Sequence, residues 1–223
     1  MFTVSDVWKT TYPGAFAGVL TMDNVANPKG HAALARRKDE LQAALRARFS
    51  SRQEIKALPT VQAYNAYYKR FKKTYHVQLQ LESVAVKGKP IPRIAALVEA
   101  MFMAELKNQL LTAGHDLDAV RPPVKLDVAG GSEQYVRLNG QEQALKAGDM
   151  FIADTQGILS SVMYGPDRRT QIRPTTTRAL FTVYAPPGLD AQAVRQHLHD
   201  IETYAQLVAP QAETELLEVY AAL

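Results

Sequence analysis

The chain has 223 residues, of which 47% are hydrophobic and 22% charged, enough for one well-packed domain with appendages. It contains no cysteine, which excludes disulfide frameworks and thiolate metal sites. No apolar run approaches the ~20 residues of a membrane helix, and no signal-peptide pattern opens the chain, so we expect a cytoplasmic protein.

The net charge of +4 is divided unevenly along the chain. Residues 1–93 hold 16 lysines and arginines against 6 acidic residues, a net of +10, whereas residues 94–223 have a net of −6. A basic half attracts phosphate backbones, which favours RNA as a partner. Solvated faces of surface helices would show the same run of cations, and the sequence leaves both interpretations open.

Two helices are predicted in the basic half, over residues 29–50 and from about Thr60 to Tyr75. The second carries an aromatic stripe formed by Tyr64, Tyr67 or Tyr68, Phe71 and Tyr75. Its cations fall largely off this stripe, so the pattern predicts buried rings and exposed positive charges. With three later cations they form the predicted RNA-binding set: Lys69, Arg70, Lys72, Lys73, Lys87, Lys89 and Arg93. A helix with a merely solvated basic face is the alternative.

Residues 77–81 alternate like a strand but also suit a helix, and the pattern does not separate the two. A loop rich in proline and glycine follows over 87–92, and then a strong helix is predicted over 93–111. Glu105 falls on the extension of the apolar stripe of that helix. Because unpaired buried charge is costly, this carboxylate lies either at the edge of the stripe or in a polar cavity.

Short β-forming segments alternate with turn signals over 124–184 and predict a strand-rich middle. A helix follows from Asp190 to about Leu207, and a short acidic helix ends at Tyr220. The predicted fold is α+β, with a helical extension over 1–63, a core over 64–207 and an acidic C-terminal helix over 208–223. The C-terminal helices are the predicted contact for a protein partner or a second copy of the chain.

Several kinds of chemistry lack their sequence signatures. The chain has no glycine-rich phosphate loop, and its histidines do not have the spacing of zinc ligands. It has no Gly-x-Ser-x-Gly elbow, and no obvious histidine and acid stand at family spacing from Ser160 and Ser161. We therefore expect no metal, no organic cofactor and no serine-hydrolase triad.

A dense polar cluster remains over residues 160–177. It centres on a Gly165-Pro166-Asp167 turn, followed by Arg168 and Arg169 and flanked by hydroxyl side chains. Two arginines in such a turn can hold a phosphate or a carboxylate. An exposed, well-capped turn between two strands explains the same residues.

Several segments between about Tyr64 and Leu207 together resemble the editing, or tRNA-binding, domain of the phenylalanyl-tRNA synthetase beta subunit. The resemblance to free-standing relatives of that domain is closer still, and the first sixty residues lie outside it. The matching segments are the proline-led helix from Pro90, the acidic turn 115–118, Gly131-Ser-Glu133, Leu138-Asn-Gly140, Ile152-Ala-Asp154 and Ser161-Val-Met-Tyr164-Gly165. The last of these resembles the family's Gly-Val-Met-Gly-Gly turn.

The resemblance implies an unusual β-sandwich flanked by helices, which in the synthetase hydrolyses tyrosine wrongly attached to the phenylalanine tRNA. The pocket histidine of the family falls on Ala113, and the glutamate that helps to select tyrosine falls on Thr182. The usual helix asparagine falls on Phe102, and one turn glycine is Tyr164. We therefore expect the selection for tyrosine to be lost. A changed amino-acid pocket and a loss of catalysis both remain open.

We predict a tRNA-binding protein that acts as a trans-editing hydrolase, positioning water without a triad. A module that binds RNA, protein or a small molecule without turnover is the alternative, since fold does not fix function. The predicted catalytic residues are Ser160, Ser161, Tyr164 and Gly165. The predicted substrate-binding residues are Glu105, Glu133 and Asp167 for the ammonium group, Arg168 and Arg169 for a phosphate, and Thr182 at the selecting position.

Overall fold

A computed structural model describes residues 2–223 as a mixed α+β fold. The helices are α1 (Asp6–Thr11), α2 (Ala32–Arg48), α3 (Arg52–Lys56), α4 (Pro59–Lys69), α5 (His76–Leu81), α6 (Ala96–Asn108) and α7 (Ala191–Val208), with a π-helical segment η1 (Glu82–Val86) and a 3₁₀ turn η2 (Leu117–Ala119). The strands are β1 (Phe2–Val4), β2 (Phe16–Asp23), β3 (Thr112–Asp116), β4 (Val124–Val128), β5 (Gln134–Val136), β6 (Glu142–Ala144), β7 (Met150–Asp154), β8 (Gly157–Ser161), β9 (Gly165–Pro166), β10 (Ala179–Ala185) and β11 (Glu213–Ala221). Within residues 2–223, no helix is both long and apolar enough to span a membrane.

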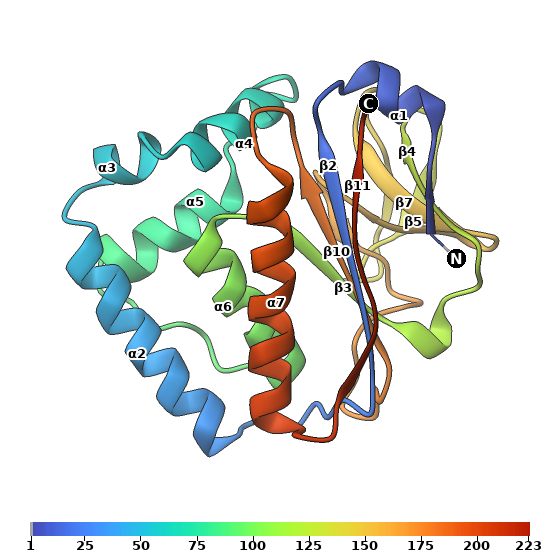
Figure 1. Cartoon of the computed structure of the whole chain (residues 1–223). Helices are drawn as coiled ribbons and strands as arrows, with labels where there is room; N and C mark the ends of the chain where they lie inside the picture. Colours follow the sequence, from blue (N-terminus) through green and yellow to red (C-terminus); the bar gives the residue numbers. More distant parts are fainter. Residues whose placement is uncertain (1) are drawn as a thin grey trace.

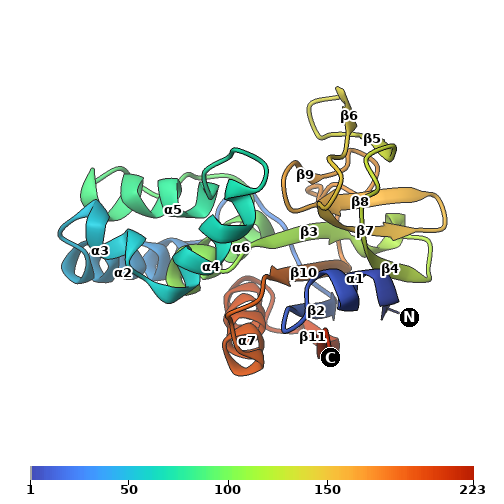
Figure 2. The same cartoon turned by 90° about the horizontal axis from the view of Figure 1, so that it is seen from above.

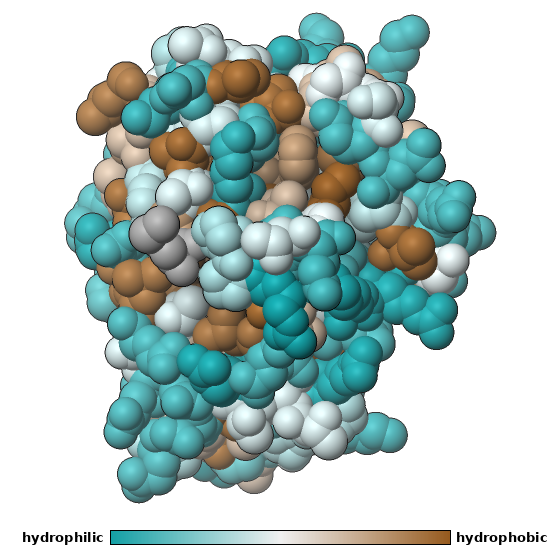
Figure 3. All heavy atoms as spheres, turned by 90° about the vertical axis from the view of Figure 1, so that its right-hand side faces the viewer, coloured by the Kyte–Doolittle hydropathy of each residue, from teal (hydrophilic) through white to brown (hydrophobic). Residues whose placement is uncertain are grey.

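The strands form two main sheets with a small ribbon beside them (Figures 1 and 2). One sheet has the order β11-β2-β10-β3 and is antiparallel throughout. The other has the order β1-β4-β7-β8-β9, in which only β1 and β4 are parallel. The ribbon of β5 and β6 projects from the second sheet (Figure 2). The strand-bearing face is mostly hydrophilic, with separate hydrophobic patches (Figure 3).

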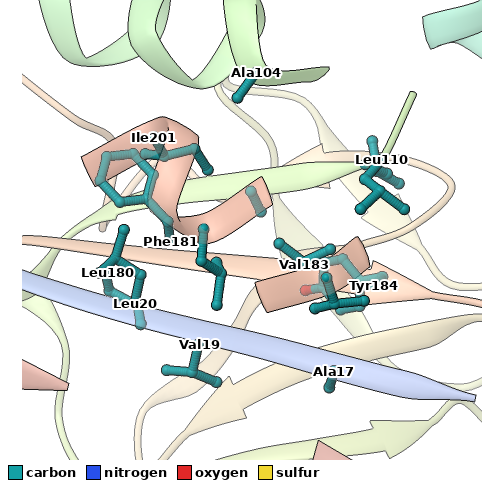
Figure 4. Close-up of a cluster of buried hydrophobic side chains, with 14 of the residues drawn as sticks. Ala17, Val19, Leu20, Ala104, Leu110, Leu180, Phe181, Val183, Tyr184 and Ile201 are labelled. Carbon is teal, nitrogen blue, oxygen red and sulfur yellow. The ribbon is translucent and has the colours of Figure 1, made fainter. Parts of the chain in front are cut away.

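The long helix α7 packs against the four-stranded sheet (Figure 1). Phe181 of β10 and Ile201 of α7 meet in this layer, and Leu20 of β2 lies beside them (Figure 4). Helix and sheet approach so closely at Gly18 that a Cβ there would lie 2.6 Å from Cγ1 of Val194. Glycine at this position therefore allows α7 to cover the sheet.

The helices α2 to α6 form a lobe beside the sheets, with its own apolar cluster around Ile55, Leu81 and Leu106 (Figure 1). A buried ion pair joins α2 to α6, since Nζ of Lys38 lies 2.6 Å from Oε2 of Glu99. Breaking such a pair by removing one partner leaves an uncompensated buried charge. This contact therefore fixes how the first long helix lies against α6.

The predicted aromatic stripe is buried, and its hydroxyls join the helical lobe to the sheets. The Tyr64 hydroxyl donates to the carbonyl of Tyr184 in β10 at 2.6 Å, and the Tyr68 hydroxyl donates to the carbonyl of Val162 at 3.0 Å. The Tyr67 hydroxyl donates to Oδ1 of Asp149 at 2.7 Å. The sequence predicted that either Tyr67 or Tyr68 belongs to the stripe; both are buried, so the stripe includes both.

The C-terminal segment corrects the sequence prediction, because residues 213–221 form strand β11 and not an acidic helix. It pairs antiparallel with β2 along almost its whole length. Its alternating exposed and half-buried residues suit a strand that covers the open edge of β2. The first 63 residues are likewise not a purely helical extension, since they supply β1 and β2 to the two sheets.

Two helix predictions also change in detail, and one open alternative is resolved. The helix from residue 60 ends at Lys69, and the chain turns through Lys72, which has a left-handed φ of 56°, before α5 begins. Residues 77–81, for which strand and helix both remained open, are helical. The helix predicted from Arg93 begins at Ala96, because residues 90–95 remain extended after Pro90 and Pro92.

Glu105 fastens the end of α6 to β3. Its side chain is buried, and Oε1 accepts the backbone N–H of Thr112 at 2.8 Å. Desolvation raises the pKa of this carboxyl to about 8, although the bond from Thr112 opposes the shift. Glu105 is thus a largely neutral hydrogen-bonding group at pH 7.

We expect Glu105→Gln to remove a loss of stability that develops as pH rises from 4.5 to about 8. The folded pKa of about 8 lies above the unfolded value of 4.5, so ionisation costs stability as pH rises between these values and no further above them. Between pH 6.5 and 8 the variant should gain on the order of 2 kcal/mol relative to wild type. Urea unfolding at several pH values measures this difference. A constant difference across that range would show that Glu105 is already ionised in the fold.

Candidate functional site

A cavity of about 160 Å³ lies where α6, β3 and the turn after β9 meet. Its walls are Val98, Met101, Thr112, Ala113, Gly114, Leu138, Pro166, Gln171 and Ile172. None of these side chains is titratable, and most are apolar. A larger cavity of about 350 Å³ lies between α2 and α7, and one of about 210 Å³ beside β5 and β8 is lined by the predicted residues Asp167 and Arg169. The cavity at β3 is singled out because Ala113, the position of the family's pocket histidine, is in its wall.

The strand β3 is an edge strand whose outer side faces this cavity. Just before β3, the carbonyl of Leu111 accepts the N–H of Tyr184, and just after it the N–H of Leu117 donates to the carbonyl of Arg178. Since hydrogen-bonded pairs alternate along an antiparallel ladder, the odd-numbered residues of β3 form the bonded pairs with β10. The even-numbered positions therefore turn their N–H and C=O groups outward. At buried Gly114, neither group has a partner within residues 2–223.

The free edge is closed on both sides of Gly114. The N–H of Thr112 donates to Glu105, and the N–H of Asp116 donates to the carbonyl of Thr170 at 2.7 Å. A second strand cannot continue along β3, because its next bonds would need these two donors. The open stretch is thus one residue long.

Ala113 and Thr182 are directly opposite each other in the β3–β10 ladder. The resemblance places the histidine and the glutamate of the family's pocket at these two positions. Ala113 lines the cavity, whereas Thr182 is fully buried and its hydroxyl has no partner within residues 2–223. The pairing brings together two positions that the sequence separates by 69 residues.

Ser160 does not line the cavity. It lies between the two sheets with 0% of its surface exposed, in a hydrogen-bonded chain with Tyr184, His115 and Thr170 that ends at Asp167. Its Oγ lies 2.6 Å from the Tyr184 hydroxyl and 3.1 Å from Nε2 of His115. The sequence spacing indicated no partner for this serine, but the packing of the two sheets against each other brings His115 to it from 45 residues away.

Burial keeps His115, the histidine of this hydrogen-bonded network, neutral. Desolvation, aided by the charge of Arg169, lowers the pKa of His115 to about 3. Because Thr170 donates to Asp167, His115 must donate from Nδ1 to Thr170 and accept at Nε2 from Ser160. Every hydroxyl proton is thereby used, and the chain ties β3 and β8 to the wall formed by residues 165–172.

The other predicted catalytic residues occupy the turn beside this wall. Ser161 is buried, and its Oγ accepts the N–H of Tyr164 at 3.2 Å. That N–H is therefore not available as an oxyanion donor. Gly165 turns with a left-handed φ of 76°, and its carbonyl accepts the Tyr135 hydroxyl at 2.7 Å. Of this turn, only the following Pro166 lines the cavity.

The predicted substrate-binding residues divide into internal and exposed groups. Glu105 is buried at the α6–β3 junction, and Glu133 accepts three backbone N–H groups of its own loop, which lowers its pKa despite partial desolvation. Asp167 is buried with Thr170, and Arg169 donates to Asp154 at 2.9 Å and to the carbonyl of Ala119 at 2.8 Å. These contacts hold each group within the protein, although Asp167 and the half-buried Arg169 also line a separate cavity of about 210 Å³ beside β5 and β8.

Arg168 is an exposed arginine of the polar cluster. It has no ion-pair partner within residues 2–223, and its guanidinium lies against Gly140, in the hairpin that also supplies Leu138 to the cavity. Arg173 is also exposed and follows the cavity residue Ile172 by one position. Sequence analysis included Arg173 in the polar cluster but did not predict a role for it.

The seven predicted RNA-binding cations are all exposed, but they form two groups. Residues 69–73 follow α4, and residues 87–93 follow η1. The helical run of 76–86 separates them by roughly 15 Å. Arg70 also lies over the ring of Tyr12, with 5.1 Å between Cζ and the ring centroid. No group of three His, Asp or Glu side chains within 2–223 is placed to hold a metal ion.

Known proteins share both segments and fold with this chain. A 69-residue segment is 32% identical to the phenylalanine–tRNA ligase beta subunit of Mycoplasma genitalium and another match of that length is 33% identical to the Mycoplasma pneumoniae protein. Each match covers 31% of this chain but only 9% of the relative. The crystal structure of an N-terminal fragment of the phenylalanyl-tRNA synthetase beta subunit from Pyrococcus horikoshii superposes on this chain with a TM-score of 0.52. The superposition covers 98% of this chain and 53% of that one. At 10% sequence identity, it shows a likeness of fold alone.

The family comparison covers the same region as the cavity and the buried network. Residues 61–216 match the model of the B3/4 domain. This stretch is more than half of the chain and runs from α4 to the middle of β11. With the beta-subunit relatives and the shared fold, it establishes a relation to the beta subunit of phenylalanine–tRNA ligase. The chain belongs to the B3/4 domain family.

Proposed function

We propose that this B3/4 domain binds tRNA and hydrolyses the ester bond of a mischarged aminoacyl-tRNA, acting in trans. The cavity at the free edge of β3 carries the proposal, because it is lined by Ala113 and lies beside the turn that resembles the family's glycine-rich turn. The relation to the ligase beta subunit supports tRNA as the carrier of the substrate. A pocket of this size suits the aminoacyl end rather than a nucleotide.

The reaction can proceed by positioning alone. The oxygen of a water attacks the ester carbonyl carbon, the carbonyl oxygen gains negative charge, and the bond to the ribose oxygen breaks. The ribose oxygen takes the proton that the water loses. The N–H of Gly114 is a preorganised donor for the carbonyl oxygen, in place of the occupied N–H of Tyr164. Orienting an activated ester in this way supplies a large part of the rate gain.

Exposed arginines near the cavity suit the phosphates of the tRNA acceptor end. Arg168 lies against the hairpin that bears Leu138, and Arg173 follows the wall residue Ile172. Arg169 is left out of this role, because it lines a different cavity and is held by Asp154 and the carbonyl of Ala119. The basic groups at 69–73 and 87–93 would contact more distant parts of the RNA through long-range attraction.

Binding without turnover is the second candidate. The position at which the family has its pocket histidine is Ala113, and no titratable side chain lines the cavity. A domain with this pocket could hold a charged tRNA end and release it unchanged. The two candidates share the cavity and the RNA surface, and they differ only in whether the ester is cleaved.

Deacylation of a panel of mischarged tRNAs separates the candidates. We expect release of at least one amino acid with an apolar side chain to exceed the rate in buffer, with tyrosine from phenylalanine tRNA not preferred. Val98→Trp should reduce this rate by about tenfold or more, since it fills the wall of the cavity with a large ring. No release from any species, with tRNA still bound, would establish the binding-only candidate.

The matched control is Val7→Trp. Val7 lies on α1, is 54% exposed and does not line the cavity. Val7→Trp makes the same change of side chain without filling the cavity, so the deacylation rate of this variant should equal that of wild type. An equal loss in both variants would show that the cavity of β3 is not the site.

Ser160→Ala tests whether the buried serine is a nucleophile. We expect the deacylation rate to stay within about threefold of wild type, because a fully buried hydroxyl does not contact the substrate. The stability should fall by about 1–3 kcal/mol, since His115 and Tyr184 each lose a partner. A loss of activity above a hundredfold in protein that remains folded would return Ser160 to a catalytic role.

Reversal of Lys69, Lys72 and Lys73 to glutamate tests the first basic group. We expect tRNA binding to weaken at low salt and the slope of log affinity against log salt to fall by roughly 0.7 for each lost contact on a single strand. Arg70 is left unchanged because it packs on Tyr12.

The control for this reversal changes the net charge equally at dispersed sites. Lys29, Lys56 and Lys146 are exposed and lie outside both basic groups. Their reversal to glutamate should leave the salt slope nearer to that of wild type. Equal effects of the two triple variants would mean that general charge, and not the group at 69–73, attracts the RNA.

A further inference from the structure

On its outward side, Gly114 places two buried backbone groups beside the cavity where, within residues 2–223, no second strand pairs with β3 and no loop or side chain bonds to them. Buried N–H and C=O groups are nearly always bonded, because leaving one unsatisfied costs about 1–3 kcal/mol. Whatever occupies the cavity should therefore present an acceptor and a donor to this one residue. The two groups point the same way from an extended strand, so an extended backbone unit matches their spacing.

The occupant can pair over one residue only. In an antiparallel bonded pair, two residues exchange both of their N–H···O bonds. Gly114 offers such a pair, but the neighbouring outward donors at Thr112 and Asp116 are taken by Glu105 and Thr170. A longer peptide strand would lose those bonds, whereas a single amino-acid unit needs none of them.

The side chain of that unit would lie over the apolar wall. Residues directly opposite each other in a ladder place their side chains on the same face. On the face of Gly114, a Cβ would lie 2.8 Å from Cδ1 of Ile172 and 3.3 Å from Sδ of Met101. Ile172, Met101 and Phe181 already fill the space at Gly114 itself, so the side chain of the partner residue would lie farther out, in the cavity that Met101 and Ile172 line.

The chemistry of the walls selects an uncharged side chain. No carboxylate or cation lines the cavity. Of its two polar side chains, Thr112 is already bonded to Nε2 of His197 at 2.6 Å, which leaves the amide of Gln171. A charged side chain would be desolvated here without a counter-ion.

We infer that Gly114 binds the aminoacyl unit of the substrate as a one-residue β-bridge and that the unit has an aliphatic side chain. The carbonyl of Gly114 accepts a bond from the α-ammonium group, and its N–H donates to the ester carbonyl. The aliphatic side chain packs against Met101 and Ile172. This inference rests on the proposed function and names its substrate class and the backbone group that recognises it.

The test is an NMR titration of the full chain, labelled with ¹⁵N, with amino-acid amides as stable probes. Leucinamide should move the Gly114 amide proton downfield in a saturable way, because that proton gains an acceptor. Lysinamide should bind more weakly, since its ammonium group meets no carboxylate. A tetrapeptide that shifts Gly114 and its neighbours more strongly than leucinamide would overturn the inference in favour of a peptide strand. A leucinamide titration that leaves Gly114 unmoved would also overturn it.

A pair of substitutions checks the position of the side chain. Gly114→Ala should weaken leucinamide binding by about tenfold, because the new methyl group would displace Cδ1 of Ile172 into the cavity. Ile172→Val removes the Cδ1 atom that the new methyl group would meet, so the double variant should regain affinity relative to Gly114→Ala. Equal affinity of Gly114→Ala and wild type, with both folded, would place the ligand elsewhere.

The outcomes separate this inference from the proposed function. Leucinamide bound at Gly114 without deacylation of any charged tRNA would retain the recognition mode and exclude the hydrolase. Deacylation of leucine-charged tRNA without any response at Gly114 would retain the hydrolase and exclude the β-bridge. Preferred release of a charged amino acid would exclude the aliphatic substrate class.

Discussion

The pairing of β3 with β10 fixes the geometry on which the candidate site depends. This register sets Ala113 opposite Thr182 and turns the polar groups of Gly114 away from the sheet. A slip of one residue would exchange the inward and outward backbone groups and move every side chain to the opposite face. Glu105 and Thr170 hold the two ends of this short strand, so the open edge keeps a defined length.

The wall opposite β3 is held by polar groups that are themselves buried. The chain from Tyr184 through Ser160 and His115 to Thr170 satisfies each hydroxyl and keeps the histidine neutral. A satisfied network of this kind costs little and specifies one arrangement, whereas a partly satisfied one would be expensive. A serine, a histidine and an aspartate are also the residue types of a hydrolase triad. Because these side chains are buried between the sheets, the network supports the 165–172 turn.

The helical lobe is tied to the same framework through tyrosine hydroxyls. Tyr64 bonds the β10 backbone at Tyr184 and also accepts the N–H of Leu111 just before β3. The rings bury large apolar surfaces while their hydroxyls pair with backbone groups, a combination that suits tyrosine in a core. The cations of α4 and the following turn then face outward from a rigid support, and the cavity and the basic surface belong to one framework.

The sequence by itself determined the elements with strong local periodicity: the buried aromatic stripe of α4, helices α2, α6 and α7, and the relation to the ligase beta subunit. It did not determine β11, because the Glu, Leu and Ala residues of this segment favour a helix locally, and the open edge of β2 selects the strand. It also suggested Ser160 as a catalytic residue and Arg169 as a phosphate ligand, since local spacing does not show that Ser160 is buried or that Arg169 pairs with Asp154. The role of Gly114 was decided only by tertiary structure, because the free N–H and C=O of a glycine arise from sheet register and from partners at Glu105 and Thr170 that no local pattern contains.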